Sequence, residues 1–220
     1  PIHIAAAYGL VGLVEHYLDQ GTDPNIPNQQ GNSPLHLCCL LDGGKRVMEV
    51  LIERSANIDL KNQNGTTPLL MLFGSSPPQM EKIEYLLKNK ADPDVADKEG
   101  RTCLQFAVQT SNQDLCERIL RQGADINAAG EHKEDGRTCL HQAVLLKQGA
   151  SEMVELLLSH QADVNQPDKL GRTPLHDAPA APDSVSIIRA LLGAGANFDA
   201  QDKDSRAPLY TAIQLANIEA

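Results

Sequence analysis

A tetrapeptide of the type Thr-Pro-Leu-His recurs along this chain at nearly constant spacing. Its apolar third residue, or the residue in that place, falls at seven positions: Ile2, Leu35, Leu69, Leu104, Leu140, Leu175 and Leu209. The steps between them are 33, 34, 35, 36, 35 and 34 residues. A chain that repeats one short unit cannot surround a single central core, so we expect an elongated stack in which each unit packs on its neighbours.

A second motif, in which two Asp or Asn residues flank one apolar or proline residue, keeps the same period. It ends the segments 21–25, 55–59, 90–94, 123–127, 161–165 and 195–199. Two motifs in constant register resemble the ankyrin repeat family, whose unit of about 33 residues carries Thr-Pro-Leu-His near the start of its first helix. The resemblance covers the whole chain.

The resemblance implies an all-α fold, an ankyrin-repeat solenoid of stacked helix-turn-helix hairpins joined by β-hairpin fingers. Residues 1–220 would form one ankyrin repeat domain of about seven repeats, with the first and last incomplete. From the motif positions we place the repeats at 1–27, 28–61, 62–96, 97–132, 133–167, 168–201 and 202–220. Because neither terminal repeat carries the polar surface that usually caps such an array, we expect a monomeric module of a longer chain.

The residues of each unit predict a helix hairpin independently of the resemblance. In Ser33-Pro34 a hydroxyl group can cap a helix while proline takes the first helical position, where its missing N–H costs nothing. An apolar stripe follows later in each unit, for example Val154, Leu157 and Leu158, and its helical spacing predicts a second helix. Each unit should therefore contain two helices.

The ends of these helices carry their own signals. Glycine, for example Gly21, stands where a left-handed residue would end the second helix. Three repeats place Ser55, Lys90 and Gln161 there instead, so we expect positive φ at these residues and strain of about 1 kcal/mol each. Pro179 falls within the first helix of the sixth repeat and should shorten it.

Composition limits the class of partner. The chain carries 19 basic and 29 acidic residues, a formal charge of −10, which disfavours long-range attraction to nucleic acid or to anionic membranes. No apolar stretch reaches the length of about 18 residues needed to span a membrane, and no signal peptide precedes the first repeat. We therefore expect no nucleic-acid partner, no direct membrane insertion, a protein or peptide partner that could present a basic face, and a cytoplasmic or nuclear location.

The histidines and cysteines invite a catalytic or metal-binding interpretation, which the period argues against. His3, His36, His141 and His176 all occupy the fourth place of the tetrapeptide, where the family uses histidine for structural hydrogen bonds. The five cysteines fall at helical positions of the repeat, and Cys116 is the one expected to be more accessible. We find no His-Glu-x-x-His helix, phosphate loop or Ser-His-Asp pattern, so the sequence predicts no enzyme activity, cofactor or metal site.

Candidate partner-binding residues follow from repeat phase. In ankyrin proteins partners usually lie on the concave side, formed by finger tips and by the first-helix residues five and six positions after the tetrapeptide leucine. In this chain the apolar residues in these places that stand out are Tyr8, Leu40, Leu41, Leu145 and Leu146. Exposed apolar residues without a packing role indicate a contact surface. The alternative is that the insertions beside both leucine pairs turn them inward.

Four arginines occupy one equivalent place, three residues before the tetrapeptide leucine: Arg101, Arg137, Arg172 and Arg206. We expect them to form a row across repeats four to seven. The row could bind an acidic peptide or a planar carboxylate. Alternatively Asp97, Asp168 and Asp202, four residues earlier in three of these repeats, could simply compensate the arginines at the surface.

Two further positions depart from the plain repeat. The finger between repeats four and five is three residues longer than the others and contains His132 and Lys133, so it is a candidate contact, although a neutral insertion explains it equally well. Asn165 follows Leu157 by eight residues and closes the step Asp163-Val164-Asn165. This matches the pattern that an intracellular asparagine hydroxylase recognises in ankyrin fingers, so the resemblance implies a candidate hydroxylation site.

These features together predict a protein-protein interaction scaffold or adaptor that binds a protein or peptide partner on its concave face and fingers. The alternative is a substrate-recruiting or regulatory ankyrin segment of a larger enzyme, channel or bacterial effector. Both interpretations assign binding to residues 1–220, and neither assigns catalysis to them.

Overall fold

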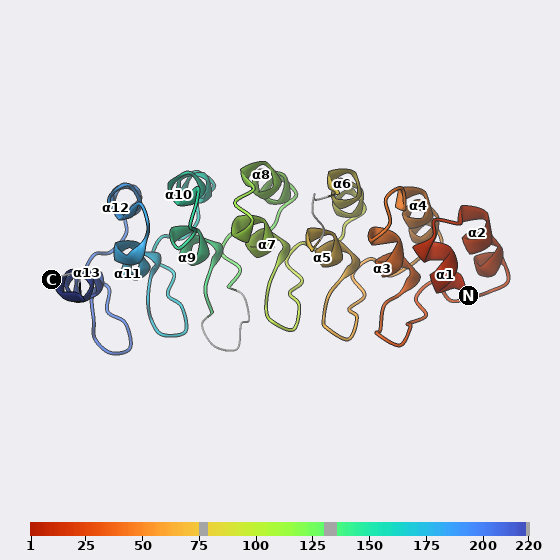
Figure 1. Cartoon of the computed structure of the whole chain (residues 1–220), viewed down its shortest axis with the longest axis horizontal. Coiled ribbons are helices and arrows are strands. Elements are labelled where there is room, and N and C mark those ends of the chain that lie inside the picture. The colour runs from red at the N-terminus through yellow and green to blue at the C-terminus, as the bar shows by residue number, and fades with distance from the viewer. Residues whose placement is uncertain (75–78, 130–135, 219–220) are drawn as a thin grey trace. The chain divides into compact units, whose positions relative to one another are not determined.

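The computed structural model describes residues 1–74, 79–129 and 136–218. Within these ranges every regular element is a helix (Figure 1). The chain divides into two compact units, residues 1–98 and residues 99–220, which we call unit 1 and unit 2. No helix in the described ranges combines the length and the apolarity that crossing a bilayer requires.

Unit 1 contains pairs of a short first helix and a longer second helix. The first helices are α1 (Ile2–Ala7), α3 (Pro34–Cys39) and α5 (Pro68–Phe73), and the second helices are α2 (Val11–Asp19), α4 (Lys45–Glu53) and α6 (Met80–Lys88). α1 packs on α3, α3 on α5, and α2 on α4. The fingers, which connect one pair to the next, project from the first helices on the side away from α4 and α6 (Figure 1).

Unit 2 repeats this plan. Its first helices are α7 (Cys103–Gln109), α9 (Cys139–Val144), α11 (Pro174–Asp177) and α13 (Pro208–Ile218), and its second helices are α8 (Gln113–Arg121), α10 (Ala150–Ser159) and α12 (Ser184–Gly193). Adjacent first helices pack on one another, as do α10 and α12. The ankyrin-repeat fold is therefore confirmed in both units, whereas the repeat limits placed from the motifs stay a prediction.

The tetrapeptide begins each first helix as expected. Thr67 has an extended backbone, its side chain accepts a hydrogen bond from the Leu70 N–H (3.2 Å), and Pro68 opens α5. The tetrapeptide leucine Leu69 is fully buried between neighbouring helices. The capping hydroxyl thus starts the helix, and the next turn places the leucine in the core.

The second helices end in left-handed residues, as the sequence predicts. Ser55, Lys90 and Gln161 have φ values of 65°, 68° and 66°. At the first of them, the Ser55 N–H donates to Ile52 O (3.0 Å) and the Ala56 N–H donates to Leu51 O (2.9 Å). These bonds satisfy the last carbonyl groups of α4, which explains why the strained conformation is kept without glycine.

Proline also acts as expected in the sixth repeat. α11 is only four residues long, and the chain continues as a short 3-10 helix, η1 (Ala178–Ala180), that contains Pro179. Proline cannot donate to the preceding turn, so the α-helix stops before it.

The fingers differ from the β-hairpins implied by the resemblance, since no residue in the described ranges forms a strand. In the finger 28–32, the Asn28 N–H donates to Asn32 O (2.9 Å). The Asn28 side-chain oxygen accepts from the N–H groups of Gln30 and Asn32, both at 2.9 Å. The side chain thus takes donors that a strand ladder would use, which leaves a tight turn instead of a hairpin.

Candidate functional site

The tetrapeptide histidines have a structural role. The Ser33 N–H donates to Nδ1 of His36 (3.1 Å), so this ring carries its proton on Nε2, which donates to Thr66 O in the next repeat (3.0 Å). His141 and His176 make equivalent bonds, and the ring of His3 bonds to Ile26 O. Burial lowers the pKa of His36 and of His141. The structural interpretation of these histidines is confirmed.

Gln105 replaces the histidine in the fourth repeat and reproduces its bonds. The Thr102 N–H donates to Oε1 of Gln105 (3.1 Å), and Nε2 of Gln105 donates to Arg137 O (3.1 Å). The same two bonds, to the helix start and to the next repeat, are therefore made without an ionisable group.

The cysteines offer no reactive thiol. All five are buried and free of disulfides. The expectation that Cys116 is more accessible is wrong, because its side chain faces the core at full burial. Burial raises the pKa of Cys116 to about 12, which leaves the thiol protonated. Across the described ranges, no three His, Cys, Asp or Glu side chains lie together in a way that could hold a metal ion.

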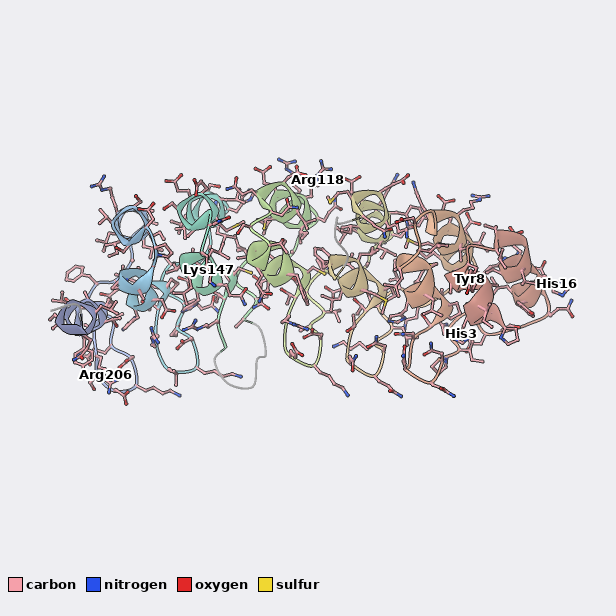
Figure 2. All side chains as sticks on the ribbon, viewed as in Figure 1. His3, Tyr8, His16, Arg118, Lys147 and Arg206 are labelled. Carbon is pink, nitrogen blue, oxygen red and sulfur yellow. The ribbon has the colours of Figure 1, made fainter. Side chains whose placement is uncertain are left out.

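In unit 1 the predicted apolar residues lie on the first-helix face. Tyr8 is 72% exposed and Leu40 is 59% exposed, and Figure 2 shows Tyr8 next to α1, of which it is the C-cap residue. Leu41 behaves differently, since a Cβ atom placed on Gly9 would lie 2.8 Å from its Cδ2. Leu41 is therefore half-buried against the turn of the preceding repeat. A binding role for these residues stays a prediction.

A buried lysine that the sequence interpretation missed holds the segment carrying Leu40 and Leu41. Lys82 extends from α6, and its Nζ donates to Cys38 O (3.1 Å), Cys39 O (3.1 Å) and Leu41 O. These carbonyl groups end α3, where a cation is favoured by the helix dipole. Desolvation lowers the pKa of Lys82. A lysine among the apolar positions of α6 was the available signal, because buried lysines usually have partners.

In unit 2 the corresponding apolar pair is less exposed. Leu145 is 38% exposed and Leu146 is half-buried. Both follow α9, and Leu145 is the C-cap residue of that helix. The alternative of an inward-turned pair thus applies in part to Leu146, and a contact role for both stays a prediction.

The four arginines do not share one environment. Arg101 pairs with Glu99 (2.8 Å), and its guanidinium lies 4.6 Å from the centre of the Phe106 ring. Arg206 pairs with Asp204 (3.1 Å) and lies 5.2 Å from the Tyr210 ring. Figure 2 shows Arg206 on the finger side of unit 2. Each of these two arginines thus meets a carboxylate of its own finger and an aromatic ring of the following helix.

Arg137 and Arg172 converge on Asp177 of α11. Nη2 of Arg137 lies 3.3 Å from Oδ2 of Asp177, and Arg172 pairs with Oδ1. Nε of Arg137 also lies 4.0 Å from Asp168. Both aspartates are buried. The expected compensation by Asp168 is only part of the arrangement, because Asp177 comes from the helix and not from the finger.

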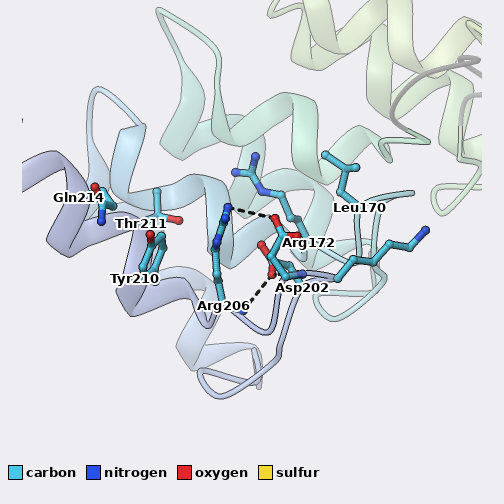
Figure 3. Close-up of a pocket in the computed structure, with 9 residues that line it drawn as sticks. Leu170, Arg172, Asp202, Arg206, Tyr210, Thr211 and Gln214 are labelled. Carbon is cyan, nitrogen blue, oxygen red and sulfur yellow. Dashed lines mark hydrogen bonds and ion pairs between the residues drawn. The ribbon is translucent and has the colours of Figure 1, made fainter.

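A cavity of about 350 Å³ in unit 2 brings Arg172 and Arg206 together. Figure 3 shows the two side chains entering it from adjacent fingers, with Tyr210 and Gln214 contributed by α13. Asp202 lies at its wall, and backbone N–H groups lower the pKa of this carboxyl. Arg172 and Arg206 are already paired with Asp177 and Asp204, so an anion entering the cavity would compete with carboxylates of the chain.

The remaining candidates are the long finger and Asn165. His132 and Lys133 lie outside the described residues. Asn165 is exposed, yet its side chain is engaged: Nδ2 donates to Gly195 O (3.0 Å) and Oδ1 accepts from the Asn197 N–H (2.7 Å). Asn25 and Asn127 also accept a bond from the next repeat, so the residue has a structural role. Its hydroxylation stays a prediction.

Comparison with known proteins agrees with this geometry. The chain is 29% identical to the Neurogenic locus notch homolog protein 1 of Danio rerio, over 60% of this chain and 5% of that protein. It is 26% identical to the E3 ubiquitin-protein ligase KEG of Arabidopsis thaliana, over 96% of this chain and 16% of that protein. The chain thus spans less than a fifth of the length of these two relatives.

One solved structure is similar to this chain over almost its whole length. The crystal structure of the ankyrin repeat domain of Bcl-3, a member of the IkappaB protein family, superposes with a TM-score of 0.80. The two chains are 28% identical, and the match covers 96% of this chain and 93% of that one. The family model of ankyrin repeats in three copies matches residues 2–74, 47–129, 70–168, 128–202 and 147–220. This chain therefore belongs to the ankyrin repeat family.

Proposed function

We propose that this chain is a protein-protein interaction module that binds a protein or peptide partner through its first-helix face and fingers. Ankyrin repeats generally mediate such interactions. The observation that carries the proposal is the exposure of Leu40 and Tyr8, the C-cap residues of α3 and α1, at the ends of helices whose tetrapeptide residues Leu35 and Ile2 are buried. A preformed surface of this kind lowers the ordering cost of association.

Affinity capture with single variants tests this function. Leu40→Glu changes the face of unit 1 and Leu145→Glu that of unit 2, while Val185→Glu on α12 is a matched control at a residue 68% exposed. Captured proteins are quantified by mass spectrometry after circular dichroism shows that the fold is kept. A loss of about 10-fold or more in one face variant alone supports the function. Equal capture by all three variants and the parent chain would rule it out.

The second candidate is a recruiting or regulatory segment of a larger protein. It is favoured by the short share of each relative that this chain matches, including a ubiquitin ligase. The complete open reading frame decides between the two: an adjoining catalytic or channel domain supports the second candidate, and further repeats alone support the first.

Three finer properties belong to the same proposal. A cytoplasmic or nuclear location is supported by five buried thiols without disulfides. A partner with a basic face is supported by the net charge of −10. A monomeric state is checked by sedimentation velocity, in which a species of twice the mass of 23.8 kDa would contradict it.

A further inference from the structure

Charged residues in unit 1 are sorted between its two helix layers. The first helices α1, α3 and α5 and the finger tips 28–32 and 62–66 contain no Asp, Glu, Lys or Arg, whereas Lys61 precedes the second tip and the next finger carries Asp97 and Lys98. The second helices carry many: Glu15, Asp19, Lys45, Arg46, Glu49, Glu53, Glu81, Lys82, Glu84 and Lys88. In a chain with 19 basic and 29 acidic residues, the absence of charge from these helices and finger tips is unexpected.

The uncharged side carries a row of apolar side chains. Leu37 and Met71 stand two places after the tetrapeptide leucine in adjacent repeats, and both are half-exposed. Ile4 holds the same place in α1 and is exposed. Leu40 and Tyr8 extend the row, since residues three or four apart lie on one face of a helix. We call Ile4, Tyr8, Leu37, Leu40 and Met71 the uncharged face.

Exposed amide side chains stand at the finger tips of the same unit. Gln29 and Asn64 are exposed at the tips of adjacent fingers. Their backbone groups are used, because Gln29 O accepts from Nε2 of Gln63 (3.0 Å) and Asn64 O accepts from the Lys98 N–H (3.0 Å). Their side-chain amides make no hydrogen bond to the described part of the chain. Each can donate and accept, which suits the N–H and C=O groups of a second polypeptide backbone.

The face is also fixed in position. Lys82 clamps the carbonyl groups that flank Leu40. A Cβ atom on Gly44, in the following turn, would lie 2.1 Å from Cys38 O, so this turn is closely packed as well. Asp42, the next charged residue after Leu41, lies beyond this clamp and its Oδ1 accepts from Gln79 (3.5 Å).

A partner that placed charged residues against α1, α3 and α5 would find no counter-charge on these helices. A buried charge without a partner costs several kcal/mol, whereas apolar side chains gain from burial. We infer that the uncharged face binds an uncharged, apolar segment of a partner protein, whose backbone is held by Gln29 and Asn64. This inference rests on the proposed function and narrows it to one class of ligand.

Selection from a random peptide library displayed on phage tests the inference, with the whole chain as the target. Enriched peptides are synthesised, and their affinities are measured by fluorescence anisotropy for the parent chain, Leu40→Glu and Val185→Glu. We expect the enriched peptides to share a central segment without charged residues. They should bind Leu40→Glu at least about 10-fold more weakly than the parent chain, and their affinity for Val185→Glu should change less than about twofold. Asn64→Lys should weaken binding while leaving the fold unchanged.

Ionic strength gives an independent readout. Affinity for the selected peptide should change less than about twofold between 50 and 500 mM NaCl, because screening acts on charges. A charged consensus, a strong salt dependence, or binding lost in Arg172→Ala but kept in Leu40→Glu would each overturn the inference. Self-association of the chain that Leu40→Glu abolishes would also overturn it, since the occupant would then be a second copy.

Different experimental results would contradict the inference and the proposed function. If lysate capture succeeds but the library yields no uncharged peptide for this face, the function stands and the ligand class is wrong. If Leu40→Glu, Leu145→Glu and the parent chain capture the same proteins, the function itself fails, and the inference fails with it.

Discussion

The third residue before the tetrapeptide leucine is Asn32 or Thr66 in unit 1, whereas in unit 2 it is an arginine in every repeat. In unit 1 the neighbouring fingers are joined by neutral amides, because Nδ2 of Asn62 donates to Oδ1 of Asn32 (2.8 Å). In unit 2 the matching place holds Arg137, which reaches Asp168 and Asp177. One backbone geometry thus supports two kinds of contact between repeats.

The comparison shows how strongly each kind of contact depends on both of its side chains being present. Neutral hydrogen bonds contribute about 1 kcal/mol each and respond weakly to salt. A buried ion pair contributes little compared with an apolar replacement, but removal of one partner is strongly destabilising. Unit 2 should therefore be more sensitive to single substitutions, although it need not be more stable than unit 1.

The largest effect is expected for Asp177→Ala. The side chains of Arg137 and Arg172 are only 23% and 27% exposed, so both would lose a carboxylate in a poorly solvated place. We expect the free energy of unfolding to fall by about 3 kcal/mol, measured by urea denaturation. The matched graft from unit 1, Arg137→Asn with Asp168→Asn, Arg172→Thr and Asp177→Met, removes both arginines together with their carboxylates and should stay within about 1 kcal/mol of the parent chain. A graft as unstable as Asp177→Ala would contradict this account.

Lys82→Met tests whether unit 1 also depends on a charge. The substitution keeps the apolar stem but removes the donors for Cys38 O, Cys39 O and Leu41 O. We expect a loss of about 2 kcal/mol in the free energy of unfolding, because buried carbonyl groups are left without a donor. Lys88→Met on the exposed side of the same helix is the control and should change stability by less than about 0.5 kcal/mol. A change in stability as small as that of Lys88→Met would show that the bonds from Lys82 are dispensable.

Acid should lower the stability of both units through their buried tetrapeptide histidines. The lowered pKa values of His36 and His141 mean that the unfolded chain takes up protons first. Stability is therefore complete above about pH 6.5 and falls as the pH drops toward the folded pKa, by at most about 1.4 kcal/mol per pH unit for each histidine. His36→Gln copies Gln105 and should remove the contribution of unit 1 in urea denaturation at pH 7.5 and 5.5. An unchanged pH dependence in this variant would exclude His36 as its source.

The smallest effect is expected from salt. Raising NaCl from 50 to 500 mM should lower the protection of backbone amides in the fingers of unit 2 by about 0.5 kcal/mol and leave the fingers of unit 1 nearly unchanged. Salt screens the ion pairs of Arg137 and Arg172 but not the neutral contact between Asn32 and Asn62. Hydrogen exchange measured by mass spectrometry resolves the two units. A larger loss of protection in unit 1 would reverse the comparison.

Features within one repeat could be predicted from the sequence. The capping of α5 by Thr67 and the positive φ of Lys90 depend on residues within a few positions along the chain. The shortening of α11 by Pro179 is equally local. In each case the side chain acts on its own backbone, so the neighbouring residues suffice to predict the result.

Features between repeats could not be predicted in the same way. Lys82 donates to Cys39 O, 43 residues earlier in the sequence, and Arg137 meets Asp177, 40 residues later. The burial of Cys116 and the packing of Leu41 on Gly9 likewise depend on how adjacent hairpins stack. The length and direction of a side chain decide such contacts only once the stack is formed.

The sequence by itself determined the ankyrin repeat, the helix starts and ends, and the histidine bonds, because the period repeats every local signal in register. The tertiary structure alone decided which charges meet, as at Asp177, and which apolar residues stay exposed, as at Leu40. The physical reason is distance. Local geometry follows from torsion angles and nearby hydrogen bonds, whereas exposure and ion pairing depend on surfaces that stacking brings together.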